Sequence, residues 1–226
     1  MVVCGHDAPS SVFHVKQTAA IESAVSEADA LHHASLEANQ VRLLADLCEW
    51  MAPRAAALGL TRYADPLELA RKLVCPTIAL ADPHLGWVIG TKCLDFGCGS
   101  GAMGLSLAII APESWVICAD RRSKAVQFVD LAAHRLGIVN CQARAVDLGA
   151  PSGADSDHEL VMVRAFVGGA DGVSLARRWT SGGGSIALWH RPPVPAVSLP
   201  LLATLNTSLP DLQLTVYTLP GDTPSP

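Results

Sequence analysis

The sequence lacks the features of a membrane protein, of a secreted protein and of a protein with a broadly basic nucleic-acid-binding surface. No apolar run reaches the roughly 20 residues that a membrane span needs, because Asp, Pro or Gly interrupts each one. The first residues show no basic segment followed by an apolar one, so we expect no secretory leader and a cytoplasmic location. Lys and Arg (16) are fewer than Asp and Glu (21), which argues against a broadly basic surface.

The cysteines also lack the arrangement of a metal site or a disulfide framework. There are seven, they are scattered, and no two have the C-x-x-C spacing. Cys93, Cys118 and Cys141 fall in or beside expected core strands, where cysteine behaves as a small apolar side chain. We therefore expect reduced thiols and no metal. With 226 residues, of which 50% are hydrophobic, the chain is long enough for one substantial core.

The most informative stretch is 92–111. A short buried strand leads into a turn with Gly97, Gly99 and Gly101, and an apolar helix follows until Pro112 ends it. Alternate glycines allow backbone dihedral angles that a side chain forbids, and they let a ligand approach the main chain. The start of the helix also offers free N–H groups and a positive dipole end, which suit an anionic or polar ligand.

Three interpretations of this turn are open. Gly99, Gly101 and Gly104 match the G-x-G-x-x-G spacing of dinucleotide-binding enzymes. Asp95 followed by the alternate glycines instead resembles motif I of class I S-adenosylmethionine methyltransferases, in which the acid helps to orient the turn and the methionine end of the cofactor. A turn with a purely structural role is the third interpretation. The acid on the strand favours the methyltransferase.

The remaining pattern predicts a doubly wound α/β domain with a mostly parallel sheet, preceded by a helical region. Strands are expected at 115–120, 141–146, 160–163, 185–189 and 212–219, and helices at 124–136, 173–179 and 199–209. Residues 1–15 are expected to be disordered, 16–90 to form the N-terminal helical region, 91–219 the S-adenosylmethionine-binding domain and 220–226 a flexible tail. Pro53 is expected to end or kink a helix.

Candidate site residues lie at the carboxyl ends of the expected strands. Asp120 ends the second strand, about 20–25 residues beyond the first acid, where a ribose is held in this fold. The ligand crevice should lie at the switch between strands one and four, so Arg164 and Phe166 should face the substrate. Asp147 is expected near the adenine, although a loop cap is equally compatible. The candidate cofactor-binding residues are Asp95, Gly97, Cys98, Gly99, Gly101, Asp120, Arg121, Val146, Asp147 and Arg164.

A longer resemblance extends over roughly residues 40–219. Residues 95–108 resemble the long glycine motif of the small-subunit ribosomal RNA guanine-N7 methyltransferases, also called the glucose-inhibited-division B family. Three further segments resemble the same family: Leu60-Thr61 with Asp65-Pro66-x-Glu68, Asp120 with Lys124 and Phe128, and Arg164-Ala165-Phe166. The resemblance implies a class I, Rossmann-like methyltransferase fold and S-adenosyl-L-methionine as cofactor.

The chain departs from the family pattern mainly where RNA contacts are expected. The Arg-His-x-x-Asp-Ser segment is replaced by residues 72–77 without the His or the Asp, and basic residues after Lys124 are lost. The Lys-Gly after strand five becomes Trp189-His190-Arg191, and the chain stops before the family's final strand, which predicts a missing C-terminal strand. The lost groups are largely those expected to meet RNA phosphates.

The predicted function is S-adenosylmethionine-dependent N-methylation of an aromatic nitrogen heterocycle, with S-adenosyl-L-homocysteine as product. The acceptor is guanine N7 of ribosomal RNA by resemblance, or a small-molecule heterocycle in view of the lost basic residues. Arg164 would hold the substrate, and His190 would accept a proton if the substrate nitrogen carries one, unless His190 lies on a solvated loop. Phe166, Trp189 and Lys124 are the substrate-side candidates, although Trp189 could instead belong to the core. The alternative is a non-catalytic scaffold or assembly protein that retains the fold.

Overall fold

The structure is a computed structural model that describes residues 9–86, 91–149, 157–164 and 169–221. Its strands are β1 (Lys92–Phe96), β2 (Trp115–Asp120), β3 (Cys141–Ala145), β4 (His158–Arg164), β5 (Thr180–His190), β6 (Leu201–Asn206) and β7 (Gln213–Thr218). They form one seven-stranded sheet in the order β3-β2-β1-β4-β5-β7-β6. Neighbouring strands from β3 to β5 are parallel, whereas β7 is antiparallel to both β5 and β6. The predicted doubly wound, mostly parallel sheet is confirmed.

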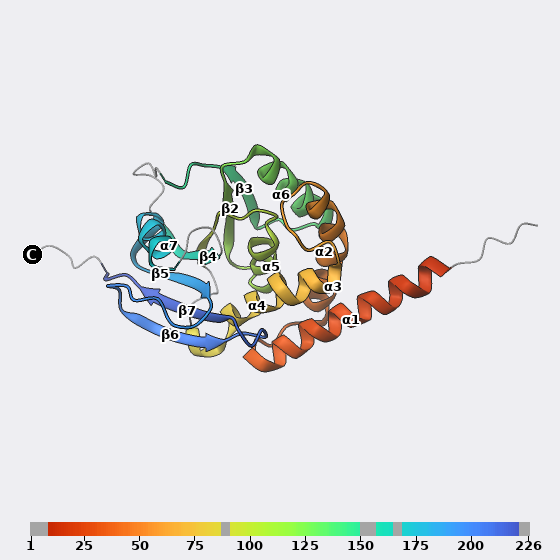
Figure 1. Ribbon diagram of the computed structural model, residues 1–226, viewed down its shortest axis with the longest axis horizontal. Coiled ribbons are helices and arrows are strands. Elements are labelled where there is room, and N and C mark those ends of the chain that lie inside the picture. The colour runs from red at the N-terminus through yellow and green to blue at the C-terminus, as the bar shows by residue number, and fades with distance from the viewer. Residues whose placement is uncertain (1–8, 87–90, 150–156, 165–168, 222–226) are drawn as a thin grey trace, which may run out of the picture.

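Helices cover both faces of this sheet (Figure 1). On one face, α5 (Ala102–Ile110) connects β1 to β2 and α6 (Ser123–Leu136) connects β2 to β3, while α7 (Gly169–Ala176) lies on the other face. Because successive side chains of a strand point to opposite faces, Cys93 packs toward α5 and Phe96 packs toward α7. The connections therefore change face between β1 and β4, which are neighbours in the sheet.

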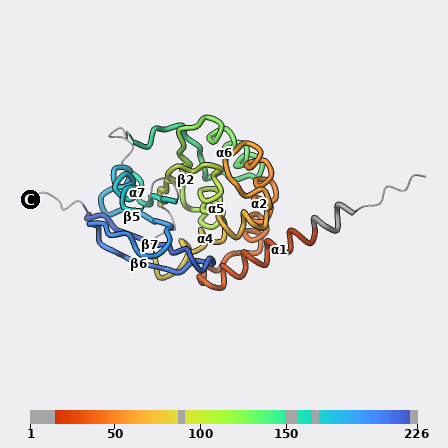
Figure 2. Tube along the Cα trace, viewed as in Figure 1, coloured from red at the N-terminus to blue at the C-terminus, as the bar shows by residue number. Residues whose placement is uncertain are grey.

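The residues before the sheet form a helical layer that packs on α5 and α6. This layer consists of α1 (Pro9–His32), α2 (Ala38–Ala57), α3 (Pro66–Leu69), the π-helical η1 (Ala70–Val74), α4 (Cys75–Ile78) and the 3-10 turns η2 (Ala79–Ala81) and η3 (Pro83–Leu85). Figure 2 shows α1 running outward from the packed helices. None of the helices in the described residues combines the length and apolar character that crossing a membrane requires.

The helical layer differs from the sequence prediction at two points. Helix α1 begins at Pro9, so the prediction that 1–15 are disordered is wrong from Pro9 onward, and residues 1–8 lie outside the described part. Helix α2 continues through Pro53 to Ala57, so Pro53 does not end it. The break between the first two helices comes earlier, where His33 and Ser35 have φ values of 50° and 58°.

The C-terminal part of the sheet also differs. The helix expected at 199–209 is wrong, because Leu201–Asn206 is strand β6 and pairs with β7, for example Leu205 with Leu214. The expectation of a missing C-terminal strand is wrong as well, since β6 and β7 bring the sheet to seven strands. A six-residue apolar segment is too short for sequence periodicity to distinguish strand from helix, and pairing with β7 decides the outcome.

Candidate cofactor site

The turn after β1 has backbone conformations that require glycine. Gly97, Gly99 and Gly101 have φ values of 78°, 58° and 77°, in the left-handed region that residues with side chains rarely adopt. The N–H groups of Gly97 and Cys98 both donate to the carbonyl oxygen of Ala119, each over 2.9 Å. These bonds fix the turn against β2, at the carboxyl end of β1.

Two of the glycines permit close packing of α5 rather than approach of a ligand. A Cβ on Gly101 would lie 2.4 Å from Cγ2 of Val129 in α6, and a Cβ on Gly104 would lie 2.3 Å from Sγ of Cys118 in β2. A Cβ on Gly99 would meet protein atoms only at 3.5 Å or more. The conformation of the turn, rather than crowding, therefore accounts for Gly99.

Asp95 is buried beneath this turn, on the last part of β1. Its Oδ2 accepts a hydrogen bond from the Gly104 N–H over 2.9 Å. Burial raises the pKa of Asp95 from 3.8 to about 7. The hydrogen bond from Gly104 and the positive charge of Arg164 lower this pKa, whereas the negative charge of Asp120 raises it further. Burial thus favours the protonated carboxyl group, and a cation placed beside it would favour the ionised form.

A cavity of about 180 Å³ opens beside the turn. Its lining residues come from the end of the sheet and the turn with the start of α5, and from the N-terminal helical layer: Asp95, Gly97, Cys98, Gly99, Ser100, Ala102, Met103 and Arg164, and Leu60, Thr61, Tyr63 and Leu73. Within the part of the chain that the structure describes, Nη1 of Arg164 is buried without a hydrogen-bond partner, while Nη2 donates to the Lys72 carbonyl oxygen. Burial lowers the pKa of Arg164 to about 10. A guanidinium group beside a cavity is suited to a carboxylate or carbonyl ligand.

The N-terminal helical layer contributes lining residues that sequence reasoning did not assign to the site. Leu60, Thr61 and Tyr63 precede α3, and Leu73 comes from η1. The guanidinium of Arg62 lies 5.0 Å from the centre of the Tyr63 ring and donates to its hydroxyl over 3.0 Å. The only sequence signal for these residues is the Leu60-Thr61 pair, which resembles a segment of the family.

Asp120 lies beside the turn, as predicted, but its carboxylate is already engaged. Its Oδ2 accepts from the Gly99 N–H over 3.0 Å. Arg122 donates to Oδ1 from its backbone N–H (2.9 Å) and its Nε (3.0 Å), and to Oδ2 from Nη2 (3.0 Å). Burial would raise the pKa of Asp120, but these hydrogen bonds and the charge of Arg122 outweigh burial and hold the pKa below its usual value.

The other candidate cofactor-binding residues lie around Asp120. The Val146 N–H donates to the Asp120 carbonyl oxygen over 3.2 Å, which places the end of β3 next to this acid. Asp147 is exposed, and its Oδ1 accepts from the Gly149 N–H over 3.0 Å, so Asp147 caps its own loop. Arg121 is exposed at the start of the connection to α6.

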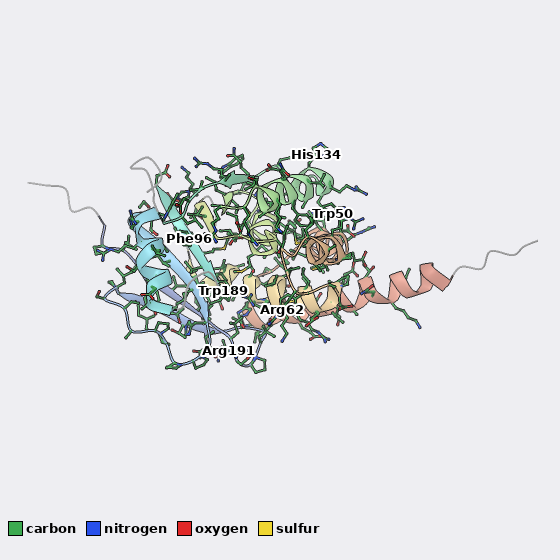
Figure 3. All side chains as sticks on the ribbon, turned by 45° about the horizontal axis from the view of Figure 1, so that its top comes forward. Trp50, Arg62, Phe96, His134, Trp189 and Arg191 are labelled. Atoms are coloured by element: carbon green, nitrogen blue, oxygen red, sulfur yellow. The ribbon has the colours of Figure 1, made fainter. Side chains whose placement is uncertain are left out.

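Two substrate-side predictions need correction. Trp189 is 3% exposed, belongs to the core and donates from Nε1 to the Pro76 carbonyl oxygen over 3.0 Å, so it does not stack on a substrate (Figure 3). The expected role of His190 as a proton acceptor is also wrong. Its Nδ1 donates to the Arg191 carbonyl oxygen over 2.9 Å, and its Nε2 accepts from the Thr215 hydroxyl over 2.8 Å. Both ring nitrogens therefore already have hydrogen-bond partners within the protein.

The two remaining substrate candidates are Lys124 and Phe166. Lys124 donates from Nζ to the Leu58 carbonyl oxygen over 2.9 Å, so it ties α6 to the end of α2. Phe166 lies outside the described residues. Across the described ranges, no group of three or more His, Cys, Asp or Glu side chains is arranged to hold a metal ion.

The strand order, the glycine turn and the acid at the end of β2 together define the Rossmann-like fold of class I methyltransferases. An RNA methyltransferase from Salinibacter ruber, solved in complex with S-adenosyl-L-homocysteine, has the same fold. Its TM-score is 0.50 at 16% identity, and the match covers 64% of this chain and 91% of that chain.

The family itself is identified by sequence. The GidB family model, described as rRNA small subunit methyltransferase G, matches residues 40–190, so the chain belongs to this family of S-adenosylmethionine-dependent methyltransferases. Ribosomal RNA small subunit methyltransferase G of Yersinia enterocolitica is 32% identical over 113 residues, which are 49% of this chain and 51% of that protein. The Methylococcus capsulatus enzyme of the same name is 32% identical over 145 residues, covering 60% and 64%. The chain therefore spans about half the length of the first of these relatives.

Proposed function

We propose that this chain binds S-adenosylmethionine at the glycine turn and transfers the methyl group to RNA of the small ribosomal subunit. The observation that carries the proposal is the cavity beside the glycine turn, whose lining includes both Arg164 and Asp95. Among the described residues, the buried Nη1 of Arg164 has no hydrogen-bond partner. A ligand end with one carboxylate and one ammonium group matches this pair of opposite charges. Membership of the family supports the cofactor, and the names of the relatives support the RNA substrate.

The residues of the site fit this cofactor. The turn at residues 97–99 lines the cavity, Arg164 and Asp95 suit the amino-acid end, and Asp120 suits ribose hydroxyl groups. The cavity of about 180 Å³ is smaller than the roughly 300–1,000 Å³ typical of small-molecule sites. It therefore suits the amino-acid half, while the nucleoside half would extend over the turn toward Asp120.

The chemistry requires little from the protein beyond binding and alignment. The bound cofactor supplies a sulfonium methyl group, and an acceptor nitrogen forms the new N–C bond as the C–S bond breaks. A ring nitrogen with a free lone pair, such as guanine N7, carries no proton to remove, so the engagement of His190 within the sheet does not impair the reaction. Leu60, Leu73 and Met103 line the cavity and limit the access of water.

Tyr63 is the aromatic residue that we assign to the substrate side. It lines the cavity, and the Arg62 guanidinium lies over its ring. An aromatic face contributes about 1–3 kcal/mol per stacked base, and an adjacent arginine adds attraction for phosphate. The small-molecule acceptor is the weaker hypothesis, because the family and the relatives of this chain are named for ribosomal RNA.

The test begins with calorimetric titration of S-adenosylhomocysteine into the wild type and into Arg164→Met. The variant keeps a long side chain but loses the donor to the Lys72 carbonyl oxygen, so its unfolding free energy should fall by about 1.5–3 kcal/mol. Its affinity for S-adenosylhomocysteine should fall about tenfold or more, because hydrogen bonds to a charged group contribute about 1.5–3 kcal/mol. Arg135→Met, an exposed change in α6, is the charge-matched control and should bind like the wild type.

The substrate is tested by transfer of a labelled methyl group to isolated small-subunit ribosomal RNA and to free guanosine. Transfer to RNA, with affinity that declines as salt concentration rises, supports the proposal. Transfer to guanosine alone would favour the small heterocycle. Absence of S-adenosylhomocysteine binding by well-folded protein would reject the enzyme and favour the non-catalytic scaffold.

A further inference from the structure

Arg122 fills the acceptor positions of the acid on which a ribose would be held. A carboxylate has two oxygens and about four positions at which it can accept hydrogen bonds. Asp120 receives four: one from the Gly99 N–H, one from the Arg122 N–H, and two from the Arg122 guanidinium. A further donor can bind to this carboxylate only if one of these four leaves.

The four donors differ in how easily they can leave. The Gly99 N–H is fixed by the turn, and the Arg122 N–H is fixed at the start of α6. The two guanidinium donors belong to a flexible side chain that is 41% exposed. A side chain with this exposure can turn into solvent, where water takes over the hydrogen bonds that the guanidinium gives up. Two adjacent ribose hydroxyl groups would bring two donors, the same number that the guanidinium would withdraw.

We propose that the Arg122 guanidinium occupies the position beside Asp120 where the ribose hydroxyl groups would bind, and that it moves away when the nucleoside cofactor binds. This inference rests on the proposed function, since it assumes that a nucleoside binds beside Asp120. The protein would then exist in two forms, with the ion pair between Arg122 and Asp120 closed or open. Only the open form binds the ribose, so the closed form lowers the apparent affinity.

Removal of the guanidinium should therefore tighten the binding of nucleoside ligands. We would titrate S-adenosylhomocysteine and 5′-methylthioadenosine, which lacks the amino-acid end, into the wild type, Arg122→Leu and Arg135→Leu. Coupling between a conformational equilibrium and ligand binding typically changes affinity about 5-fold or more. Because Arg122→Leu cannot form the closed ion pair, it should bind both ligands at least about 5-fold more tightly. Arg135→Leu makes the same change of charge elsewhere on α6 and should bind like the wild type.

Equal or weaker binding of both ligands by folded Arg122→Leu would overturn the inference. Arg122→Lys supplies a second test, because an ammonium group cannot make the bidentate contact and should give an intermediate affinity. An NMR signal of the Arg122 side chain reports directly on whether the guanidinium leaves Asp120. The Nε–H resonance of Arg122, assigned by its absence in Arg122→Leu, should lose protection from solvent exchange as S-adenosylhomocysteine saturates the wild type.

These outcomes separate the inference from the proposed function. If S-adenosylhomocysteine binds while the Arg122 Nε–H stays protected, the displacement of Arg122 is wrong and the cofactor site stands. If neither the wild type nor Arg122→Leu binds the ligand, the proposed function itself is wrong. Binding by Arg122→Leu with weak or undetectable binding by the wild type would be the strongest support for the inference.

Discussion

The N–H of Gly99 donates to the carboxylate of Asp120 over 3.0 Å, which joins the turn after β1 to the end of β2. The turn is also held from the same strand by the Ala119 carbonyl oxygen, which accepts from Gly97 and Cys98. The turn and the acid are thus one hydrogen-bonded unit. Substitution of the acid should therefore affect the conformation of the turn as well as ligand affinity.

Asp120→Asn separates these two effects. The asparagine oxygen can still accept from Gly99, so the turn should persist, but the ion pair with Arg122 is lost. We expect a loss of stability of about 1.5–3 kcal/mol in urea denaturation, because the buried carboxylate accepts hydrogen bonds from a charged group. Calorimetry should show affinity for S-adenosylhomocysteine reduced about tenfold or more, since a charged acceptor has been removed. Unchanged affinity would mean that Asp120 does not contact the ligand.

Gly101→Ala should be destabilising because it combines backbone strain with a steric clash. The residue has φ of 77°, and the new Cβ would lie 2.4 Å from Val129 Cγ2. Left-handed strain costs about 1–2 kcal/mol and overpacking about 1–3 kcal/mol, so urea denaturation should show a loss of about 2–5 kcal/mol. Gly59→Ala is the matched control, because Gly59 has φ of 65° and its Cβ would meet no atom within 4 Å. Equal losses would contradict close packing of α5 on α6.

The sequence was sufficient to predict the sheet centre and the turn, because both depend on local chemistry. Gly97, Gly99 and Gly101 report a backbone conformation directly, and Asp120 follows an apolar run that has no other reasonable structure than a buried strand. The strand at residues 201–206 could not be predicted in this way. Its six residues suit either helix or strand, and the partner that decides lies further along the chain, in β7.

Side-chain roles were harder to predict than elements. Trp189 and His190 do lie at the carboxyl end of β5, where ligand contacts are expected, but partners from distant segments engage them, Pro76 and Thr215 respectively. Tyr63 was missed for the opposite reason. It comes from the N-terminal helical region, and only folding brings it to the cavity at the end of β1.

Trp189→Phe and Tyr63→Ala should therefore give opposite results. Trp189→Phe removes the donor to Pro76 and leaves space in the core, so urea denaturation should show a loss of about 1–3 kcal/mol, with normal binding of S-adenosylhomocysteine. Tyr63→Ala changes a half-buried residue and should reduce stability less, but methyl transfer to RNA should fall about tenfold because a stacking surface is lost. A transfer defect in Trp189→Phe with unchanged stability would place Trp189 at the site after all.

The raised pKa of Asp95 predicts a specific dependence of stability on pH. The folded protein holds the Asp95 proton up to about pH 7, whereas the unfolded chain releases it near its ordinary value of 3.8. Between these values the folded state binds more protons, so stability should fall as pH rises from about 4 to about 7 and then level off. The full difference corresponds to about 4 kcal/mol as an upper limit.

Asp95→Asn isolates this effect from other groups that titrate in the same range. The asparagine oxygen can accept from the Gly104 N–H, and the variant carries no charge to bury. Its stability relative to the wild type, measured by urea denaturation, should be greatest above about pH 7 and should decline toward about pH 4.

A cationic ligand group beside Asp95 should ionise it, so S-adenosylhomocysteine binding near pH 7 should release protons in the wild type and fewer in Asp95→Asn. Calorimetry in two buffers of different ionisation enthalpy measures this release, and equal release by both proteins would show that the ligand's ammonium group does not lie beside Asp95.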